Sequence, residues 1–344
     1  MPARLVQQHD LSAAAFNAGA VGAAITISTV SVGAAANSAI MSTDSNAGAD
    51  VWFSSDAAGT LPLAAKLVYW SDGDSEFKFK VYFGSVSAVS GATVYLHVGS
   101  KPGGISTDPF PATAEVRAPM ISDFADITSN GNDGTGAGGV AAGAVTGPDG
   151  VLPATTFDGT DDSVAFGDLS SAITVNGTAS AWVKTVGVGT IAQSGLWTLG
   201  TSTSLTHYPF TNNRLYVVGF TDARQINGLL DTGFDKTAWH HIAITRTASN
   251  WTMYRNGVVL ATTSGGTFGL PADAKFGESS DTVFYRGDAS GFSLDSVART
   301  ASEINADYLL DGPNAATYWT VTDVTPGGGR SRLRTRTRGR RRLA

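Results

Sequence analysis

Carboxylate side chains are the first candidates for chemistry in this chain. Cleavage of a glycosidic bond needs two of them, flanking the scissile bond as acid and as nucleophile or base. The four glutamates, Glu76, Glu115, Glu278 and Glu303, are far apart in the sequence, and the pair Asp161-Asp162 lies in an evident turn. The spacing of the acids does not favour hydrolysis, and we expect no catalytic residues.

The adjacent histidines His240 and His241 are the next candidates, for metal binding or catalysis. They fall in the alternating run Trp239–Arg246, which is typical of a β-strand. Adjacent residues of a strand point to opposite faces of the sheet, so the two rings cannot easily bind one ion. We expect both histidines to be structural.

The run that contains these histidines also opens a β-meander. A second run ends at Arg255, a third starts at Val258, and Asn256-Gly257 separates them. Asn-Gly between alternating runs predicts a type I′ hairpin, because both turn residues need a positive φ. Such a meander must bury one face against a second sheet. We expect the core to contain Trp239, Ile242, Ile244 and Trp251.

The overall composition indicates an all-β protein. Gly, Ser, Thr, Ala and Val dominate, and short alternating runs lie between turn residues. At 344 residues the chain can hold two domains. It has no cysteine, which excludes disulfides and thiolate metal sites but leaves the redox compartment open. We expect no membrane span and no secretory signal.

The charge is distributed unevenly along the chain. Residues 330–344 hold eight arginines and no acid; removing these eight from the 23 basic residues leaves 15 against 29 acidic ones, a net charge of −14 for residues 1–329. In an extended tail the arginines at even positions would lie on one face. We expect the tail to contact an acidic subunit surface or nucleic acid, with a solvated tail as the alternative. The contact residues would be Arg330, Arg332, Arg334, Arg336, Arg338, Arg340, Arg341 and Arg342.

Changes in composition divide the chain into four parts. Residues 1–45 are rich in Ala, Gly and Ser and are predicted as a flexible leader or attachment segment. Residues 46–112 contain runs such as Phe77–Phe83, with phenylalanines inward and Lys78 and Lys80 outward, and predict a small antiparallel sandwich. Residues 113–322 form the second domain, and 323–344 a glycine joint and the tail.

One short helix is expected near the end of the second domain. Thr300-Ala-Ser-Glu303 has the spacing of a capping box, in which the threonine hydroxyl and the glutamate carboxylate bind each other's backbone N–H. The helix should run through Leu310 and stop at Asp311-Gly-Pro313.

Several motifs between residues 126 and 304 occur in the order of a known family. They are Asp126–Thr135, Phe157–Val164, Ala179–Lys184, Trp239–Arg246, Tyr254–Val258, Phe292–Val297 and Thr300–Ile304. Together they resemble laminin-G-like, concanavalin A-like jelly-roll domains. Ser296, where the family usually has Glu, and the short link from Val297 to Thr300 depart from the pattern. Residues 48–100 resemble a small uncharacterised β-sandwich family that often precedes this jelly roll.

The resemblance implies two kinds of site in the loops. Several jelly rolls of this superfamily bind calcium through Asp and Asn oxygens, the hard ligands that the ion prefers. The candidates here are Asp158, Asp161, Asp162 and Asp295, with ordinary turn chemistry as the alternative. Sugar sites in such sandwiches combine an exposed aromatic ring with hydrogen-bonding side chains. The candidates for glycan binding are Trp197, Tyr208, Arg214 and Arg224.

We therefore expect a small antiparallel β-sandwich followed by a concanavalin A-like jelly roll, with a flexible leader and an Arg-rich tail. The function that we favour is a non-enzymatic structural and adhesion protein of a phage virion, such as a head decoration, fibre or tail-associated protein. It would be oligomeric, contact other virion proteins through its tail and bind host-surface or environmental glycans. The alternatives are a bacterial surface or secreted carbohydrate-binding adhesin and, third, a glycan-processing enzyme.

Overall fold

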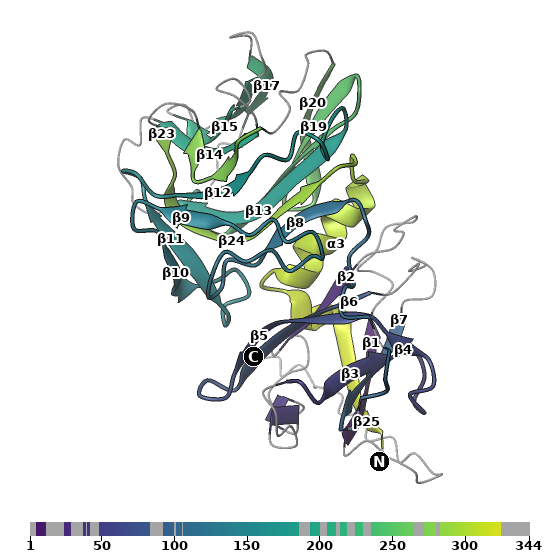
Figure 1. The fold of residues 1–344 in the computed structure, drawn as a ribbon. Helices are drawn as coiled ribbons and strands as arrows, with labels where there is room; N and C mark the ends of the chain where they lie inside the picture. Colours follow the sequence, from purple (N-terminus) through teal and green to yellow (C-terminus); the bar gives the residue numbers. More distant parts are fainter. Residues whose placement is uncertain are drawn as a thin grey trace, which may run out of the picture.

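Two lobes of β-sheet are joined by one helix, α3 (Ala301–Asp311), in the part of the chain that the structure describes (Figure 1). This computed structural model describes residues 5–11, 24–28, 37–38, 40–41, 48–82, 92–99, 101–104, 106–185, 193–199, 205–210, 214–218, 224–229, 235–264, 272–279 and 283–324. Among them, no helix is long and apolar enough to cross a membrane. The observed elements confirm the predicted all-β class.

The larger lobe is a sandwich of two antiparallel sheets. Its strands are β8 (Ala114–Ala118), β9 (Thr135–Ala137), β10 (Ala141–Thr146), β11 (Pro153–Asp158), β12 (Ser163–Gly167), β13 (Gly177–Thr185), β14 (Gln193–Leu199), β15 (Leu205–Phe210), β16 (Arg214–Val218), β17 (Arg224–Leu229), β18 (His240–Arg246), β19 (Asn250–Arg255), β20 (Val258–Ser264), β21 (Ala274–Phe276), β22 (Glu278–Ser279), β23 (Val283–Phe284) and β24 (Arg286–Asp295). One sheet has the order β10-β11-β24-β13-β18-β19-β20, with β8 also paired to β24. The other has the order β17-β16-β15-β14-β21-β12-β9. Buried aromatic side chains such as Phe157, Phe276 and Phe292 fill the space between them.

The meander of this lobe forms as the sequence predicts. Asn256 and Gly257 have φ values of 51° and 75°, as the type I′ turn between β19 and β20 requires. Ile242, Ile244 and Trp251 are buried in the core. Trp239 is only half-buried, with the amine of Lys184 lying 5.8 Å from its ring centroid.

The small lobe also has two sheets. The first has the order β25-β1-β7-β3-β4 and the second the order β2-β6-β5. Their strands are β1 (Leu5–Leu11), β2 (Ala24–Ser28), β3 (Val51–Ser54), β4 (Pro62–Leu63), β5 (Ala65–Ser71), β6 (Glu76–Tyr82), β7 (Ala92–Val98) and β25 (Trp319–Val324). Phe77, Phe79 and Val81 point into the core as predicted, and Phe83 lies outside the described residues.

Segments from both ends of the chain take part in the small lobe. β1 lies between β7 and β25, and β2 pairs with β6. Two stretches of the predicted leader are thus strands, because these neighbours satisfy their backbone N–H and C=O groups. The arginine-rich tail, residues 330–344, lies outside the described residues.

The helix α3 belongs to both lobes. Its capping box is present as predicted: the Thr300 hydroxyl accepts from the Glu303 N–H at 3.3 Å, and the Glu303 carboxylate accepts from the Thr300 N–H at 2.7 Å. Ile304 packs on Ala243 and Tyr254 of the larger lobe. Ala306 and Leu310 lie in the core of the small lobe. After α3 a 3₁₀ turn, η2 (Ala315–Tyr318), leads the chain into β25.

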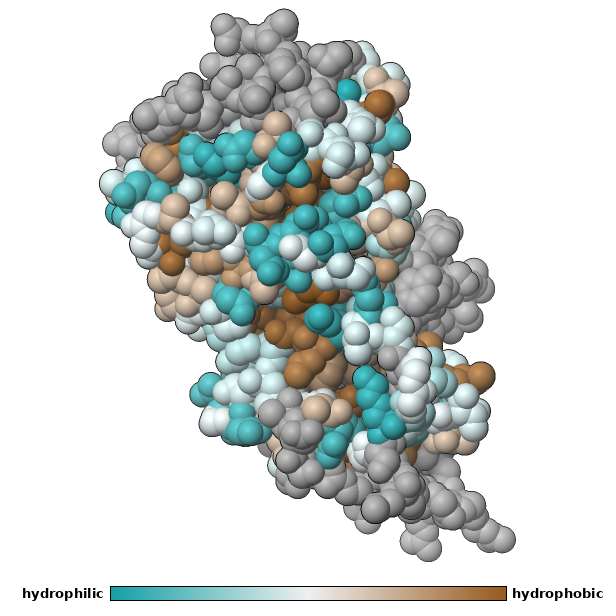
Figure 2. All heavy atoms as spheres, in the orientation of Figure 1, coloured by the Kyte–Doolittle hydropathy of each residue, from teal (hydrophilic) through white to brown (hydrophobic). Residues whose placement is uncertain are grey.

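Apolar residues also gather at the junction of the lobes. Figure 2 shows them as a brown area between the larger lobe above and the small lobe below. The shared helix, which packs into the cores of both lobes, indicates that the lobes are held together by burial as well as by the covalent chain.

Candidate functional site

An acidic turn connects β11 to β12, and so joins the two sheets of the larger lobe at one end. The carboxylate oxygens of Asp158, Asp161 and Asp162 lie within 4.8 Å of one another. Asp158 and Asp161 are exposed, whereas Asp162 is buried. The structure therefore brings together three of the four aspartates that the sequence suggested as calcium ligands.

Hydrogen bonds and close backbone packing hold this turn in one conformation. The Asp162 carboxylate accepts from the Asp158 N–H at 2.8 Å, and the Asp158 carboxylate accepts from the Thr160 N–H at 2.7 Å. Gly159 has a φ of +79°, and a Cβ there would lie 2.6 Å from the Cβ of Arg286. The turn thus needs glycine at this position, and the carboxylates of Asp158 and Asp162 are held by hydrogen bonds before any ligand arrives.

The electrostatics of the turn favour a cation. Burial raises the pKa of Asp162; the hydrogen bond from the Asp158 N–H opposes this, and the charges of Asp158 and Asp161 raise the pKa further. A divalent cation would relieve the repulsion between the three carboxylates. The hard oxygen donors suit calcium, but the three carboxylates supply only part of the six to eight ligands that it prefers, so water or carbonyl oxygens would complete the shell.

Asp295, the fourth predicted ligand, does not belong to this cluster. Arg286, at the start of β24, pairs with Asp158, whereas Asp295 ends the same strand. At the rise of a β-strand, this places Asp295 about 30 Å from the turn. Asp295 is instead buried in an ion pair with Arg117. The prediction that it shares an ion with the other three is corrected.

The predicted glycan-binding residues do not form one surface in the described part of the chain. Trp197 is only 1% exposed and packs between Phe276 and Phe292, so it offers no aromatic face to a sugar. This prediction is wrong because Trp197 points inward from β14. Tyr208, Arg214 and Arg224 fall in β15, β16 and β17, but their side chains lie outside the described residues.

The two histidines lie on opposite faces of β18, as predicted. His241 is buried beside Trp182, with ring centroids 5.5 Å apart, and burial lowers its pKa to about 4. His240 is half-buried, its Nε2 lies 2.8 Å from the carbonyl oxygen of Asp235, and burial lowers its pKa as well. The two rings therefore cannot share a metal ion.

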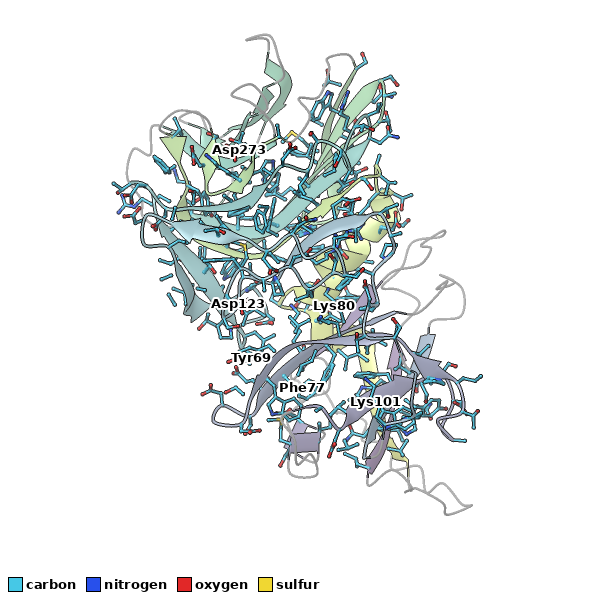
Figure 3. The ribbon with its side chains drawn as sticks, in the orientation of Figure 1. Tyr69, Phe77, Lys80, Lys101, Asp123 and Asp273 are labelled. Carbon is cyan, nitrogen blue, oxygen red and sulfur yellow. The ribbon has the colours of Figure 1, made fainter. Side chains whose placement is uncertain are left out.

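An ionic contact between the lobes was missed by the sequence reasoning. The carboxylate of Asp311, at the end of α3, lies 2.8 Å from the Lys80 amine and 3.1 Å from the Lys78 amine, and accepts from the Thr26 hydroxyl at 2.6 Å. Figure 3 shows Lys80 at the junction of the lobes. The two lysines point outward from the small lobe as predicted, but they face α3. The alternation of Lys78 and Lys80 along β6 could have shown that both lysines point outward. Nothing in the sequence identified Asp311 as their partner, because it lies far away in the chain.

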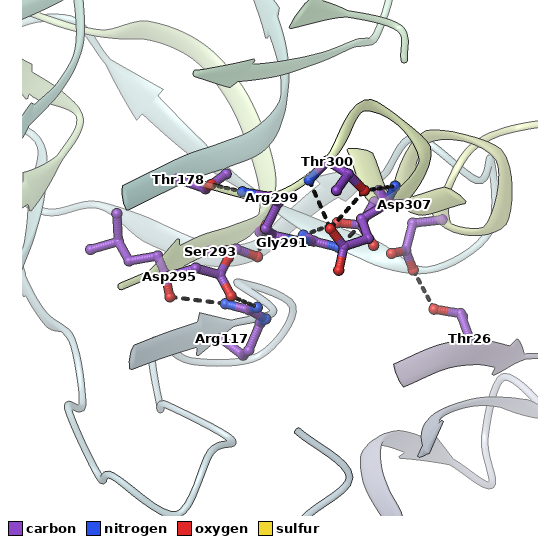
Figure 4. Close-up of polar contacts among 12 residues, drawn as sticks. Thr26, Arg117, Thr178, Gly291, Ser293, Asp295, Arg299, Thr300 and Asp307 are labelled. Atoms are coloured by element: carbon purple, nitrogen blue, oxygen red, sulfur yellow. Dashed lines mark hydrogen bonds and ion pairs between the residues drawn. The ribbon is translucent and has the colours of Figure 1, made fainter. Parts of the chain in front are cut away.

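Two further ion pairs lie close to this contact. Arg117 of β8 pairs with Asp295, and Arg299 pairs with Asp307 of α3 (Figure 4). Arg117 also donates to the carbonyl oxygens of Val116 and Leu294. Each charged group at the junction therefore has a partner of opposite charge, which is what a buried charge requires.

Comparison with known proteins supports the jelly-roll assignment. Residues 158–305 match the family model of the concanavalin A-like lectin/glucanases superfamily. This segment is a concanavalin A-like jelly-roll domain. No curated protein matches the chain.

Several solved structures are similar to part of this chain. Domain 4 of AbnA, an extracellular arabinanase from Geobacillus stearothermophilus in complex with arabinotriose, is 18% identical, with a TM-score of 0.46 over 56% of this chain and 97% of that domain. The binding domain of Paraclostridial Mosquitocidal Protein 1 is 15% identical, with a TM-score of 0.47 over 57% of this chain and 52% of its own. The botulinum neurotoxin DC binding domain in complex with SialylT is 12% identical, with a TM-score of 0.46 over 57% of this chain and 51% of its own. The chain thus spans about half the length of the two toxin domains.

The interlobe contact predicts a pH-dependent stability. Burial alone would raise the pKa of Asp311, but Lys78 and Lys80 hold it well below its usual range. A carboxyl group with a depressed pKa stabilises the folded state fully above its unfolded pKa, and the contribution is lost as the pH falls. Asp311→Asn should therefore lower the free energy of unfolding by about 3 kcal/mol at pH 7, and by less at about pH 3.

Urea unfolding at the two pH values measures this difference. The matched control is Asp273→Asn, which removes a more exposed contact at 3.2 Å to Lys275 and should cost less than about 1 kcal/mol. Equal losses in the two variants would contradict a structural role for Asp311.

The acidic turn predicts calcium binding. Calorimetry should show heat on adding calcium, and calcium should raise the melting temperature relative to chelator, because a ligand that binds only the folded state stabilises it. The double variant Asp158→Asn/Asp161→Asn should lose both effects, whereas Asp168→Asn, in the loop after β12, should keep them. Absence of heat and of any melting shift in the unmodified protein would exclude the site.

Proposed function

We propose that this protein is a non-enzymatic glycan-binding protein in which the jelly roll acts as a lectin-like module. The observation that carries the proposal is the placement of the acids within a fold whose family includes both lectins and glucanases. A glycosidase holds its two carboxyl groups about 5 to 9.5 Å apart on either side of the substrate. The four glutamates lie on separate elements, and no two of them share a strand or helix: Glu76 is on β6, Glu115 on β8, Glu278 on β22 and Glu303 in α3.

The surroundings of individual acids also favour a structural role for them. Glu303 completes the capping box of α3, and Glu278 lies 3.3 Å from the amine of Lys275. Asp288 accepts from the hydroxyl of Thr156 and lies 3.2 Å from the Lys184 amine. These carboxylates are therefore already engaged with neighbouring groups of the fold. These contacts support binding over hydrolysis as the activity of the larger lobe.

The acidic turn is the described place best suited to a glycan. Its two exposed carboxylates can accept hydrogen bonds from sugar hydroxyl groups, directly or beside a bound calcium ion. The exposed Arg286 lies next to the turn and carries donors as well. A rigid turn at the end of a sandwich binds at low entropic cost, because its side chains are already placed.

We also propose that the protein is displayed on a phage virion through its small lobe and arginine-rich tail, with a bacterial surface or secreted adhesin as the alternative. Val6 of β1 and Val324 of β25 are neighbours, so the described chain starts and ends together in the small lobe (Figure 1). Attachment there would leave the jelly roll exposed. The arginines of the tail suit an acidic subunit surface or nucleic acid.

A glycan array tests the lectin proposal. Labelled protein should bind a limited set of glycans, and Asp158→Asn/Asp161→Asn should weaken binding about tenfold or more, because charged acceptors make the stronger hydrogen bonds. Asp168→Asn serves as the matched control and should bind normally. Failure to bind any glycan would contradict the proposal, and release of reducing sugar from polysaccharides would favour the enzyme alternative.

Deletion of residues 330–344 tests the attachment proposal. If the tail anchors the protein through its charge, the truncated protein should be lost from purified particles when these are analysed by mass spectrometry. Replacing the eight arginines with lysine keeps the charge and should preserve incorporation. Unchanged incorporation of the truncated protein would exclude an anchoring role for the tail.

A further inference from the structure

The junction of the two lobes encloses a cavity of about 110 Å³, the interlobe cavity. Its walls include apolar residues such as Val68 and Ile121, and its four cationic side chains are already in ion pairs. A charged ligand would have to displace these pairs, so the interlobe cavity is poorly suited to one.

The small lobe contains a larger cavity, of about 310 Å³, between its two sheets. It lies where the chain crosses from one sheet to the other, because β4 ends at Leu63 and β5 begins at Ala65. Six residues of its lining belong to the apolar core of this lobe or pack against it: Val51, Phe53, Leu63, Ala65, Leu67 and Phe79. Protein interiors leave few voids larger than a water molecule, so an apolar space of this size suits an apolar occupant.

The backbone groups at the cavity restrict the kind of occupant. The Val51 N–H donates to the carbonyl oxygen of Gly48 at 3.1 Å, and the Ala65 N–H donates to that of Ser106 at 3.3 Å. A peptide that adds to a sheet edge needs free backbone groups to pair with. These bonds therefore favour an apolar chain, which needs no hydrogen bonds, over an inserted peptide strand.

The charged residues of the described lining are two lysines and no acid, although the body of the chain is acidic. Lys66 lies on the opposite face of β5 from its core-packed neighbours and interacts with the charge of Asp108. Lys101 is exposed, has no ion pair among the described residues, and lies on the small lobe in Figure 3. Thr107 and Ala49 are exposed too, so these residues mark the opening of the cavity. The amine of Lys101 is thus available to an anionic group at the opening.

We propose that this cavity binds a linear aliphatic carboxylate, with its chain between the sheets and its carboxylate at Lys101. An apolar cavity of about 150 Å³ holds one benzene ring, so the cavity here accommodates about ten carbon atoms. Burial of the chain supplies the affinity, and the amine selects a negative head group. The site lies in the small lobe, and the inference does not rest on glycan binding by the larger one.

Titration calorimetry of the full-length protein tests this inference, with butanoate, hexanoate, octanoate, decanoate and dodecanoate as probes below their micelle concentrations. Each added CH₂ group should tighten binding about fourfold, because it is removed from water. The gain should end at about ten carbon atoms, where the cavity is full. Decanoate should also raise the melting temperature.

Three variants locate the bound chain and its head group. Ala65→Phe should abolish binding, because the ring fills the cavity. Lys101→Gln should weaken the binding of decanoate about fivefold and leave that of decanol, which has no charge, unchanged. Lys236→Gln removes a lysine of the larger lobe and is the matched control, which should bind decanoate normally.

The inference is overturned if no carboxylate binds, if dodecanoate gains as much over decanoate as decanoate does over octanoate, or if Lys101→Gln and Lys236→Gln bind decanoate equally. Should Ala65→Phe fail to melt cooperatively, the chain-length series and the two lysine variants decide. Asp158→Asn/Asp161→Asn should bind decanoate normally even if it loses the glycan array signal, which separates this site from the acidic turn.

Discussion

The arrangement of the two lobes depends on the carboxylate of Asp311. It ends the shared helix α3 and contacts two lysines and a hydroxyl group of the small lobe. Two charges taken out of water are costly unless geometry and hydrogen bonds are good, and here four groups converge at 2.6 to 3.1 Å. An error in the position of the helix would leave these charges unpaired. The contact therefore specifies one orientation of the lobes, whereas the apolar residues beside it supply the burial.

Although α3 is short, it contributes to the packing of both lobes. One side packs on Ala243 and Tyr254, and the other enters the core around Phe77 and Leu96. Neither sandwich buries its surface fully without α3. The polypeptide then returns to the small lobe as β25 and pairs with β1. The first and last described strands thus belong to the same sheet. The small lobe is therefore built from segments at both ends of the described chain, and the larger lobe from residues between them.

The acidic turn and the interlobe cavity differ in their physical character. The acidic turn concentrates exposed charge at the end of a sandwich, where a required glycine sets the backbone and hydrogen bonds hold two of the three carboxylates. The interlobe cavity instead combines apolar walls with charges that already neutralise one another. The first suits a cation or a large surface glycan.

The sequence by itself determined the local structure. The Asn256-Gly257 turn, the Thr300–Glu303 capping box and the acidic turn follow from neighbouring residues, whose conformational preferences do not depend on the rest of the chain. The jelly roll could also be predicted, because its motifs recur in a fixed order. The tertiary structure alone decided that Trp197 points inward, that Asp295 pairs with Arg117, and that Lys80 meets Asp311. These depend on strand register and on contacts between residues far apart in the chain, and no local pattern encodes either.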